Sequence, residues 1–159
     1  ASATFTNKHL NETKRLNNPR INLIIGMPSR HDHIAFVELH NQFADRFNGY
    51  YLNSQPPVHS KTYSWCYHSN GVMGFSGSSN YSQQGFIDSS QINQMTKDDP
   101  LQIKRFFEEL LQNPNLYNIK ALSKRLYQVN LSGKSEIADI QLIDGSIIRG
   151  DLGGGGTVN

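Results

Sequence analysis

The chain has almost no cysteine and no long apolar segment. Cys66 is the single cysteine among 159 residues, which excludes an internal disulfide and is typical of a protein from a reducing compartment. No run approaches the roughly 20 apolar residues that a membrane-spanning helix requires. The sequence does not open with a basic segment followed by an apolar one, so we predict no retained signal peptide. These absences favour a cytoplasmic protein with no membrane contact.

Charged and hydrophobic residues are both scarce. Charged side chains make up 18% of the chain and hydrophobic ones 36%, while eight phenylalanines and seven tyrosines supply bulk for a core. The formal net charge of +2 permits binding to nucleic acid without arguing strongly for it. We expect one domain with a small appendage, because 159 residues fall in the usual range for that size.

The first twenty-seven residues predict a helix followed by a strand. A polar helix over 4–16, capped by Thr6 or Asn7, is ended by the residues 17–19. The apolar run 21–27 lies between turn residues and predicts a buried, parallel strand.

The loop after this strand holds candidate substrate contacts. Ligands bind beyond the carboxyl ends of strands in open α/β sheets, so Arg30 and His31 are placed there. A helix is predicted over 32–47, ended by the turn pair at 48–49. Its apolar face recurs at helical spacing and consists of Phe36, Leu39, Phe43 and Phe47. The histidines of this region do not have the spacing of a helical metal-binding pair, so no metal site is predicted.

The second half predicts two more helices and a change of pattern. Asp99 caps a helix that begins at Pro100, and the polar segment before it contains a short strand over 91–95. A second helix is predicted over 118–128. From 129 the residues alternate, and Asp144-Gly145 predicts the turn of a β-hairpin over 130–152. We therefore divide the chain into a domain over 1–128 and a β appendage with a glycine-rich tail over 129–159.

The segment 57–80 has the strongest local pattern. Residues 57–66 alternate as a strand, and 72–80 follow as its return. Asn70-Gly71 predicts the turn between them, because both residue types accept a positive φ. Pairing about this turn brings the end of the return strand back beside the start of the first strand.

Four polar side chains converge in such a hairpin. His59 and Lys61 share one face of the first strand, and Ser78 and Asn80 return beside them. An imidazole there can act as a nucleophile that forms a phosphoryl-histidine. Lys61 can then neutralise negative charge on the phosphate oxygens, and Ser78 and Asn80 can donate hydrogen bonds to them. The alternative is an exposed strand next to an ordinary Gly-Ser loop.

This spacing resembles a known signature. His59-Ser60-Lys61 with Gly77-Ser78-Ser79-Asn80 is similar to the HxK…GSxN signature of the phospholipase D superfamily, and the segment 77–86 is similar to its restriction-endonuclease branch, the NgoFVII-like and BfiI-like nucleases. The resemblance covers about residues 1–112. It implies an α/β fold, with a phospholipase D-like mixed sheet flanked by helices, in which His59 is the nucleophile and neither a metal nor another cofactor is needed.

Two positions depart from the pattern. Tyr67 stands where many superfamily members have an aspartate, and Gln91 stands nearest to where the restriction branch has a glutamate, with Asp88 the nearby acid. We take Gln91, together with Gly77 and Ser79 of the motif, as substrate-binding residues.

The resemblance implies a metal-independent endonuclease that acts on DNA, of the type II restriction kind. Because the chain has a single His-x-Lys and the superfamily uses two, we expect a homodimer with a shared site, and further restriction-system subunits as partners. Two alternatives stay open: a phospholipid phosphodiesterase of the same superfamily, and a non-catalytic DNA-binding subunit. Superfamily domains begin with a strand that is not seen before Ala1, so we expect this chain to be part of a longer protein.

Overall fold

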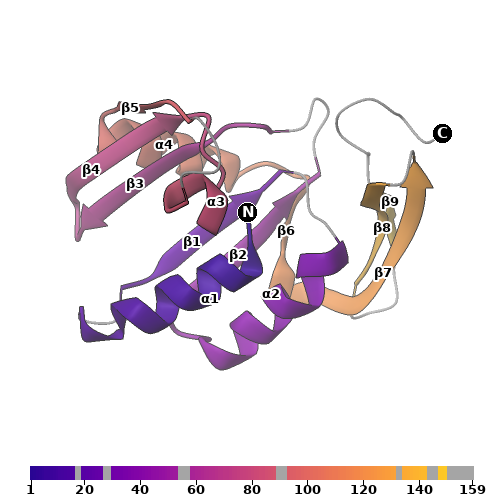
Figure 1. Cartoon of the computed structure of the whole chain (residues 1–159). Coiled ribbons are helices and arrows are strands. Elements are labelled where there is room, and N and C mark those ends of the chain that lie inside the picture. The colour runs from indigo at the N-terminus through magenta and orange to yellow at the C-terminus, as the bar shows by residue number, and fades with distance from the viewer. Residues whose placement is uncertain are drawn as a thin grey trace.

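The computed structural model describes residues 1–16, 19–26, 30–53, 58–88, 93–131, 134–142 and 147–149, with backbone alone for 30, 31 and the strand residues beyond 122. Its strands form three separate three-stranded sheets (Figure 1). The first sheet has the order β1-β2-β6, the second β3-β4-β5 and the third β7-β8-β9. The predicted mixed α/β class is confirmed, while the specific phospholipase D-like arrangement of the mixed sheet stays a prediction.

The first sheet is mixed and is covered by two helices. Its strands are β1 (Ile21–Ile25), β2 (Phe47–Leu52) and β6 (Leu116–Asn118). β1 runs parallel to β2, as predicted for the first strand, and β6 runs antiparallel to β2. Helices α1 (Ala3–Glu12) and α2 (Arg30–Gln42) lie over one face of this sheet (Figure 1).

The limits of these helices differ from the prediction. Ser2 caps α1, because its hydroxyl accepts a hydrogen bond from the Phe5 amide at 3.2 Å, and a 3-10 turn over Thr13–Arg15 follows. Helix α2 ends at Gln42, and Phe47 opens β2. The predicted end at 48–49 was wrong because the helical spacing of apolar residues continues past the end of α2 into β2. The residues of both elements pack on the same core.

The core lies between the first sheet and its helices. The predicted apolar face is buried, although Phe43 lies in the turn and Phe47 in β2. Ile119 and Leu122 are also buried. The central cluster consists of Ala3, Leu10, Ile25, Phe36, Leu39, Phe43, Phe47, Tyr51, Ile119 and Leu122.

The second sheet is an antiparallel meander. Its strands are β3 (Thr62–Tyr67), β4 (Asn70–Gly77) and β5 (Met95–Lys97), with the short helix α3 (Gln83–Phe86) between β4 and β5. Helix α4 (Pro100–Leu110) follows, and the predicted cap is confirmed because Asp99 Oδ1 accepts from the Leu101 amide at 3.0 Å. Helix α4 packs on β3 and β4.

The predicted hairpin is present, but its turn lies two residues earlier. Tyr67 pairs with Asn70, so His68 and Ser69 form the loop, and His68 takes a left-handed φ of 55°. A tight hairpin turn needs such a φ. The register also shifts by one residue between Trp65 and Cys66, as in a β-bulge.

The helix predicted over 118–128 was wrong. Asn118 Oδ1 accepts from the Lys120 amide at 2.9 Å and caps a 3-10 turn over Ile119–Ala121. The chain then extends as β7 (Leu122–Leu131), which pairs with β8 (Lys134–Leu142), and β8 pairs with β9 (Ile147–Arg149). The apolar spacing of the segment did not distinguish a helix from a strand that finds a partner.

The division into two domains at 128–129 stays a prediction, as does a separate appendage. The predicted turn at Asp144-Gly145 and the glycine-rich tail lie outside the described residues.

Candidate active site

The segment that carries His59 and Lys61 lies beside the end of β1. Gly26 directly follows β1 and contacts Val58 so closely that an added Cβ would collide with the Val58 carbonyl oxygen. Only glycine permits this approach of two backbones. His59 therefore lies at the carboxyl end of the first strand, although it precedes β3 rather than forming part of it.

His59 and Lys61 lie within contact of each other. The Lys61 ammonium Nζ is 3.3 Å from His59 Nε2 and 3.5 Å from the His59 carbonyl oxygen. The His59 side chain is exposed and Lys61 is partly exposed. Lys61 can donate to the imidazole nitrogen, and its partly exposed ammonium can also turn toward an anion that enters here.

The pairing of β3 with β4 brings the second half of the motif back to this segment. The Gly77 amide donates to the Lys61 carbonyl oxygen at 3.1 Å, which extends the ladder beyond Thr62 and Ser76. The prediction that the end of the return strand lies beside Lys61 holds, although a turn at Asn70-Gly71 would have placed Asn80 rather than Gly77 opposite Lys61. The observed placement results from the strand register rather than from the turn type.

Ser78 is fixed by the segment before β5. Its hydroxyl accepts from the Gln94 amide at 2.9 Å, and its own amide donates to the Gln94 carbonyl oxygen at 2.9 Å. The hydroxyl is also 3.5 Å from that carbonyl oxygen, a long distance for a hydrogen bond. The Ser78 proton can therefore turn toward a bound anion while the oxygen stays in place.

The backbone of Asn80 is held in a tight turn. Its carbonyl oxygen accepts from the Ser82 amide at 2.8 Å, and a Cβ added at Gly85 would collide with that oxygen. The Asn80 side chain is exposed. A fixed backbone with an exposed amide is the arrangement that a hydrogen-bond donor to a phosphate needs.

Ser79 differs from its neighbours because its side chain is buried, with 3% exposed. Its carbonyl oxygen accepts from the Tyr63 hydroxyl at 2.7 Å. Burial raises the pKa of Tyr63 to about 12, so the phenol stays protonated and remains a donor. Ser79 thus contributes a backbone anchor to the motif, while Ser78 and Asn80 present side chains to solvent.

Sequence reasoning missed a cluster that ties the motif to the N-terminal helix. The Tyr81 hydroxyl lies 2.5 Å from His9 Nδ1, and the Ser2 amide donates to the Tyr81 carbonyl oxygen at 2.9 Å. The Phe5 ring packs edge-on against Tyr81. Burial lowers the pKa of His9 and raises that of Tyr81, so the phenol donates to a neutral imidazole. Tyr81 directly follows the motif, and this aromatic residue was the feature of the sequence that could have indicated the cluster.

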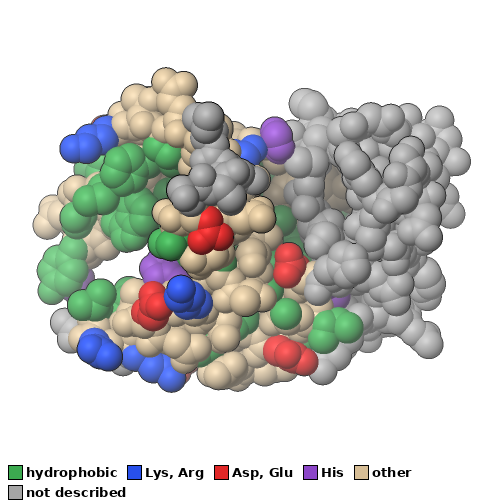
Figure 2. Space-filling model, viewed as in Figure 1, with side chains coloured by type: hydrophobic (Ala, Val, Ile, Leu, Met, Phe, Trp, Pro, Cys, Tyr) green, Lys and Arg blue, Asp and Glu red, His purple; other side chains and the backbone are tan. Residues whose placement is uncertain are grey.

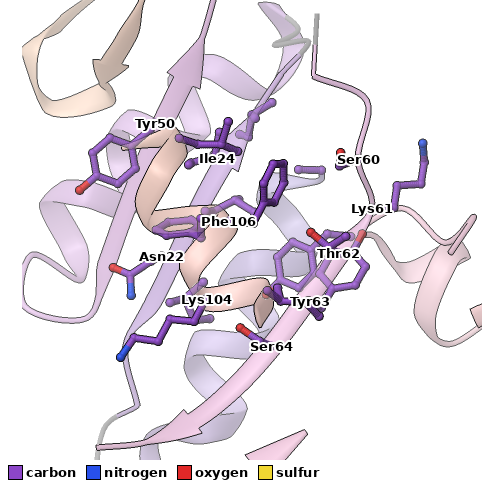
Figure 3. Close-up of a pocket in the computed structure, with 18 of the residues that line it drawn as sticks. Asn22, Ile24, Tyr50, Ser60, Lys61, Thr62, Tyr63, Ser64, Lys104 and Phe106 are labelled. Atoms are coloured by element: carbon purple, nitrogen blue, oxygen red, sulfur yellow. The ribbon is translucent and has the colours of Figure 1, made fainter. Parts of the chain in front are cut away.

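A cavity of about 830 Å³ adjoins these residues and separates the first sheet from the second. His59, Lys61 and Asn80 line it, together with β1, β3 and helix α4. Figure 2 shows an opening between the β3–β4 hairpin and the N-terminal helix. In the close-up, Phe106 of α4 lies between Tyr50 of β2 and Tyr63 of β3 (Figure 3).

Three predicted site residues are described only in part or not at all. The backbones of Arg30 and His31 form the first turn of α2, beyond the end of β1, and their side chains are not described. Gln91 lies outside the described residues. Among the described residues, no group of three or more histidine, cysteine or acidic side chains is gathered as metal ligands would be, and no helix has the length and apolarity to cross a bilayer.

A histidine and a lysine lie beside a returning Gly-Ser-x-Asn strand, at the edge of the cleft. Residues 1–125 match the model of the family described as NgoFVII restriction endonuclease N-terminal PLD domain. The chain belongs to this family, a branch of phospholipase D-like restriction nucleases, as the resemblance indicated. No curated protein and no solved structure matches the chain.

Proposed function

We propose that this chain is the nuclease part of a type II-like restriction endonuclease and hydrolyses DNA phosphodiesters without a metal. The observation that carries the proposal is the His59–Lys61 contact of 3.3 Å at the edge of a cleft that Asn80 also lines. Family membership supports DNA as the substrate.

The reaction has two steps at His59. First, His59 Nε2 attacks phosphorus and forms a P–N bond, while the P–O bond to the leaving strand breaks and that oxygen takes a proton from a general acid. Second, water attacks the phosphohistidine, breaks the P–N bond and loses a proton to the same group, now a base. The products are a free hydroxyl end, a phosphate end and unmodified His59.

Lys61, Ser78 and Asn80 stabilise the charge that develops on the phosphate. The partly exposed ammonium of Lys61 moves from His59 to a non-bridging oxygen, and the Ser78 hydroxyl and the Asn80 amide donate to the oxygens. Preorganised donors of this kind each contribute roughly 100- to 1,000-fold in rate. The Gln94 amide supports Ser78 because it leaves the hydroxyl proton free to face the substrate.

The general acid is His59 of a second copy. The chain has a single His-x-Lys, so a two-fold axis at the site would supply one histidine as nucleophile and its equivalent as acid and base. The exposure of His59 supports this arrangement because the side chain is accessible to another molecule.

The test is cleavage of plasmid DNA in excess EDTA by wild type, His59→Ala and the control His68→Asn. His68 is exposed at the hairpin turn, and asparagine tolerates its left-handed φ. We expect wild type and His68→Asn to cut, and His59→Ala to lose at least about 1,000-fold. Sedimentation of the same samples measures the dimer.

Three results would contradict the proposal. Cleavage by His59→Ala at the wild-type rate would show that His59 is not the nucleophile. Cleavage that requires magnesium in all three proteins would replace the mechanism by a metal-dependent one. A gel shift without cleavage under every condition would identify a DNA-binding subunit instead.

A further inference from the structure

Tyr63 joins the two halves of the motif. It follows Lys61 by two residues along the chain, and its hydroxyl donates to the Ser79 carbonyl oxygen at 2.7 Å. Its ring packs edge-on against Phe86, with the ring centroids 5.0 Å apart and an angle of 86° between the planes. The segment that carries Lys61 therefore also holds the Gly-Ser-x-Asn segment, through this one side chain.

The Tyr63 hydroxyl fixes one particular peptide group. The Ser79 carbonyl and the Asn80 N–H belong to the same planar trans peptide, so the Asn80 N–H points away from the Tyr63 hydroxyl. Burial raises the pKa of Tyr63 to about 12, which keeps the phenol a donor near neutral pH. The direction of the Asn80 N–H is thus set before any ligand arrives.

This backbone N–H has no acceptor in the protein. Across the part of the chain that the structure describes, the amides of Ser79, Asn80 and Tyr81 donate no hydrogen bond to another residue, whereas the amides of Gly77 and Ser78 do. Ser79 is 3% exposed and Tyr81 is 7% exposed, but Asn80 is an exposed residue. A backbone N–H without a protein acceptor needs water or a ligand. Of the three, the amide at Asn80 is therefore the one that a ligand can reach.

The surroundings of this amide favour an anion. His59, Lys61, Tyr63 and Asn80 all line the same cleft. The Lys61 ammonium contacts His59, and no described acid forms an ion pair with it. Backbone N–H groups that point outward from a turn are a common means of binding anions.

We propose that the Asn80 backbone amide donates to a non-bridging oxygen of the phosphate, and that Tyr63 is the positioning residue that directs this amide. The inference rests on the proposed function for the place of the phosphate beside His59. It adds a backbone donor to the Ser78 hydroxyl and the Asn80 side chain. Tyr63 itself touches no reacting atom and acts through the peptide that it holds.

Titration with inorganic phosphate in EDTA tests the donor directly. Nuclear magnetic resonance of isotope-labelled protein records each backbone amide. We expect the Asn80 amide proton to shift downfield and to saturate at the same phosphate concentration as the His59 ring signals, because a hydrogen bond to an anion forms. Asn80→Ala keeps the backbone N–H, so the amide at position 80 should still shift, at higher phosphate concentrations. This variant separates the backbone donor from the side chain.

Three matched variants test the positioning role. Tyr63→Phe removes the hydroxyl but keeps the ring, and it should weaken phosphate binding by about tenfold and reduce the shift of the Asn80 amide. Phe86→Leu removes the ring that packs on Tyr63 but leaves the hydroxyl. Tyr67→Phe removes an exposed hydroxyl from the same strand. Both controls should bind phosphate as wild type does, and the amide spectra show that each variant is folded.

Cleavage of plasmid DNA measures the consequence for the reaction. Tyr63→Phe should lower kcat by at least about tenfold, because the donor acts on charge that develops in the transition state. KM for the plasmid should change by less than about twofold, since contacts with other phosphates of the duplex are unaltered. Phe86→Leu and Tyr67→Phe should keep the wild-type kcat.

An Asn80 amide that does not shift with phosphate would overturn the inference, as would wild-type phosphate affinity and kcat in Tyr63→Phe. Equal weakening by Phe86→Leu would assign the effect to ring packing and overturn it as well. Cleavage in EDTA that depends on His59, combined with an unshifted Asn80 amide, rejects this inference alone. A saturable shift at Asn80 without cleavage under any condition rejects the proposed function alone.

Discussion

The first sheet with α1 and α2 and the second sheet with α4 differ in how deeply their side chains are buried. Eight of the ten residues of the central core cluster belong to the first region or to the 3-10 turn beside it, while Phe43 lies in the turn between α2 and β2 and Leu122 starts β7. Within the described part of β3, β4, β5 and α4, by contrast, only Gly74 is buried. The second region instead exposes Trp65, Tyr67, Val72 and Met73.

The buried residues that stabilise the fold are therefore concentrated in the first region, apart from the exposed residues of the candidate site. The motif residues lie where the second region meets the first, so a well-packed unit positions a loosely packed one. Sites placed on such boundaries combine a rigid support with accessible side chains. Stability and activity should therefore respond to different substitutions.

The largest effect should come from removing a core ring. Phe47 is fully buried and stacks on Phe36 with ring centroids 6.1 Å apart. Phe47→Ala should lower the free energy of unfolding by about 3–5 kcal/mol because it leaves a cavity. Val72→Ala, at an exposed site in β4, should change it by less than about 0.5 kcal/mol. Urea denaturation measures both, and equal losses would contradict the contrast.

An acid-dependent loss should also originate in the first region. His40 is buried, its Nε2 accepts from the Gly49 amide at 3.0 Å, and burial followed by the nearby Lys120 lowers its pKa to about 4. The folded state thus favours neutral His40. Its contribution is complete above the ordinary pKa of 6.5 and is lost as the pH falls toward 4.

Between pH 7 and pH 5 this linkage should cost about 2 kcal/mol in the free energy of unfolding. His40→Gln should reduce the loss, because glutamine does not titrate and can still accept from Gly49. His68→Asn, which alters an exposed histidine of the second region, should lose as much stability between pH 7 and pH 5 as wild type does. Denaturation curves at the two pH values measure this loss. An equal loss of stability in all three proteins would exclude His40 as the cause.

The smallest effect should come from the contact that joins the two regions. Tyr81→Phe keeps the ring packing but removes the hydrogen bond to His9, so the free energy of unfolding should fall by about 1 kcal/mol. Tyr67→Phe, at an exposed position of the hairpin, should have no effect. Thermal melts of the two variants compare them, and matching melting temperatures would show that the joint contributes nothing.

Much of the first region could be predicted from the sequence. The apolar run before Gly26 and the helical recurrence of Phe36 and Leu39 both reflect burial on a single core, and the Asp99-Pro100 start of α4 is a local signal. The failures occurred where one apolar pattern spans two kinds of element. Phe47 and Leu122 continue a helical period but lie in strands, because partners distant in the sequence supply their hydrogen bonds.

The candidate site divides in the same way. Spacing predicted that Ser78 and Asn80 return to the neighbourhood of His59 and Lys61, because a hairpin brings its end back beside its beginning; that these four residues form the site stays a prediction. It could not identify Gln94 behind Ser78 or His9 beside Tyr81. Those partners depend on which segments fold over the motif.

The sequence by itself determined the hairpin, the motif and the family, because these depend on residue type and short spacing. The tertiary structure alone decided that the sheets remain separate, that Ser79 is buried while its neighbours are exposed, and that a cleft lies between β1 and β3. The physical reason is that burial and strand pairing are set by residues far apart in the chain, which no local pattern records.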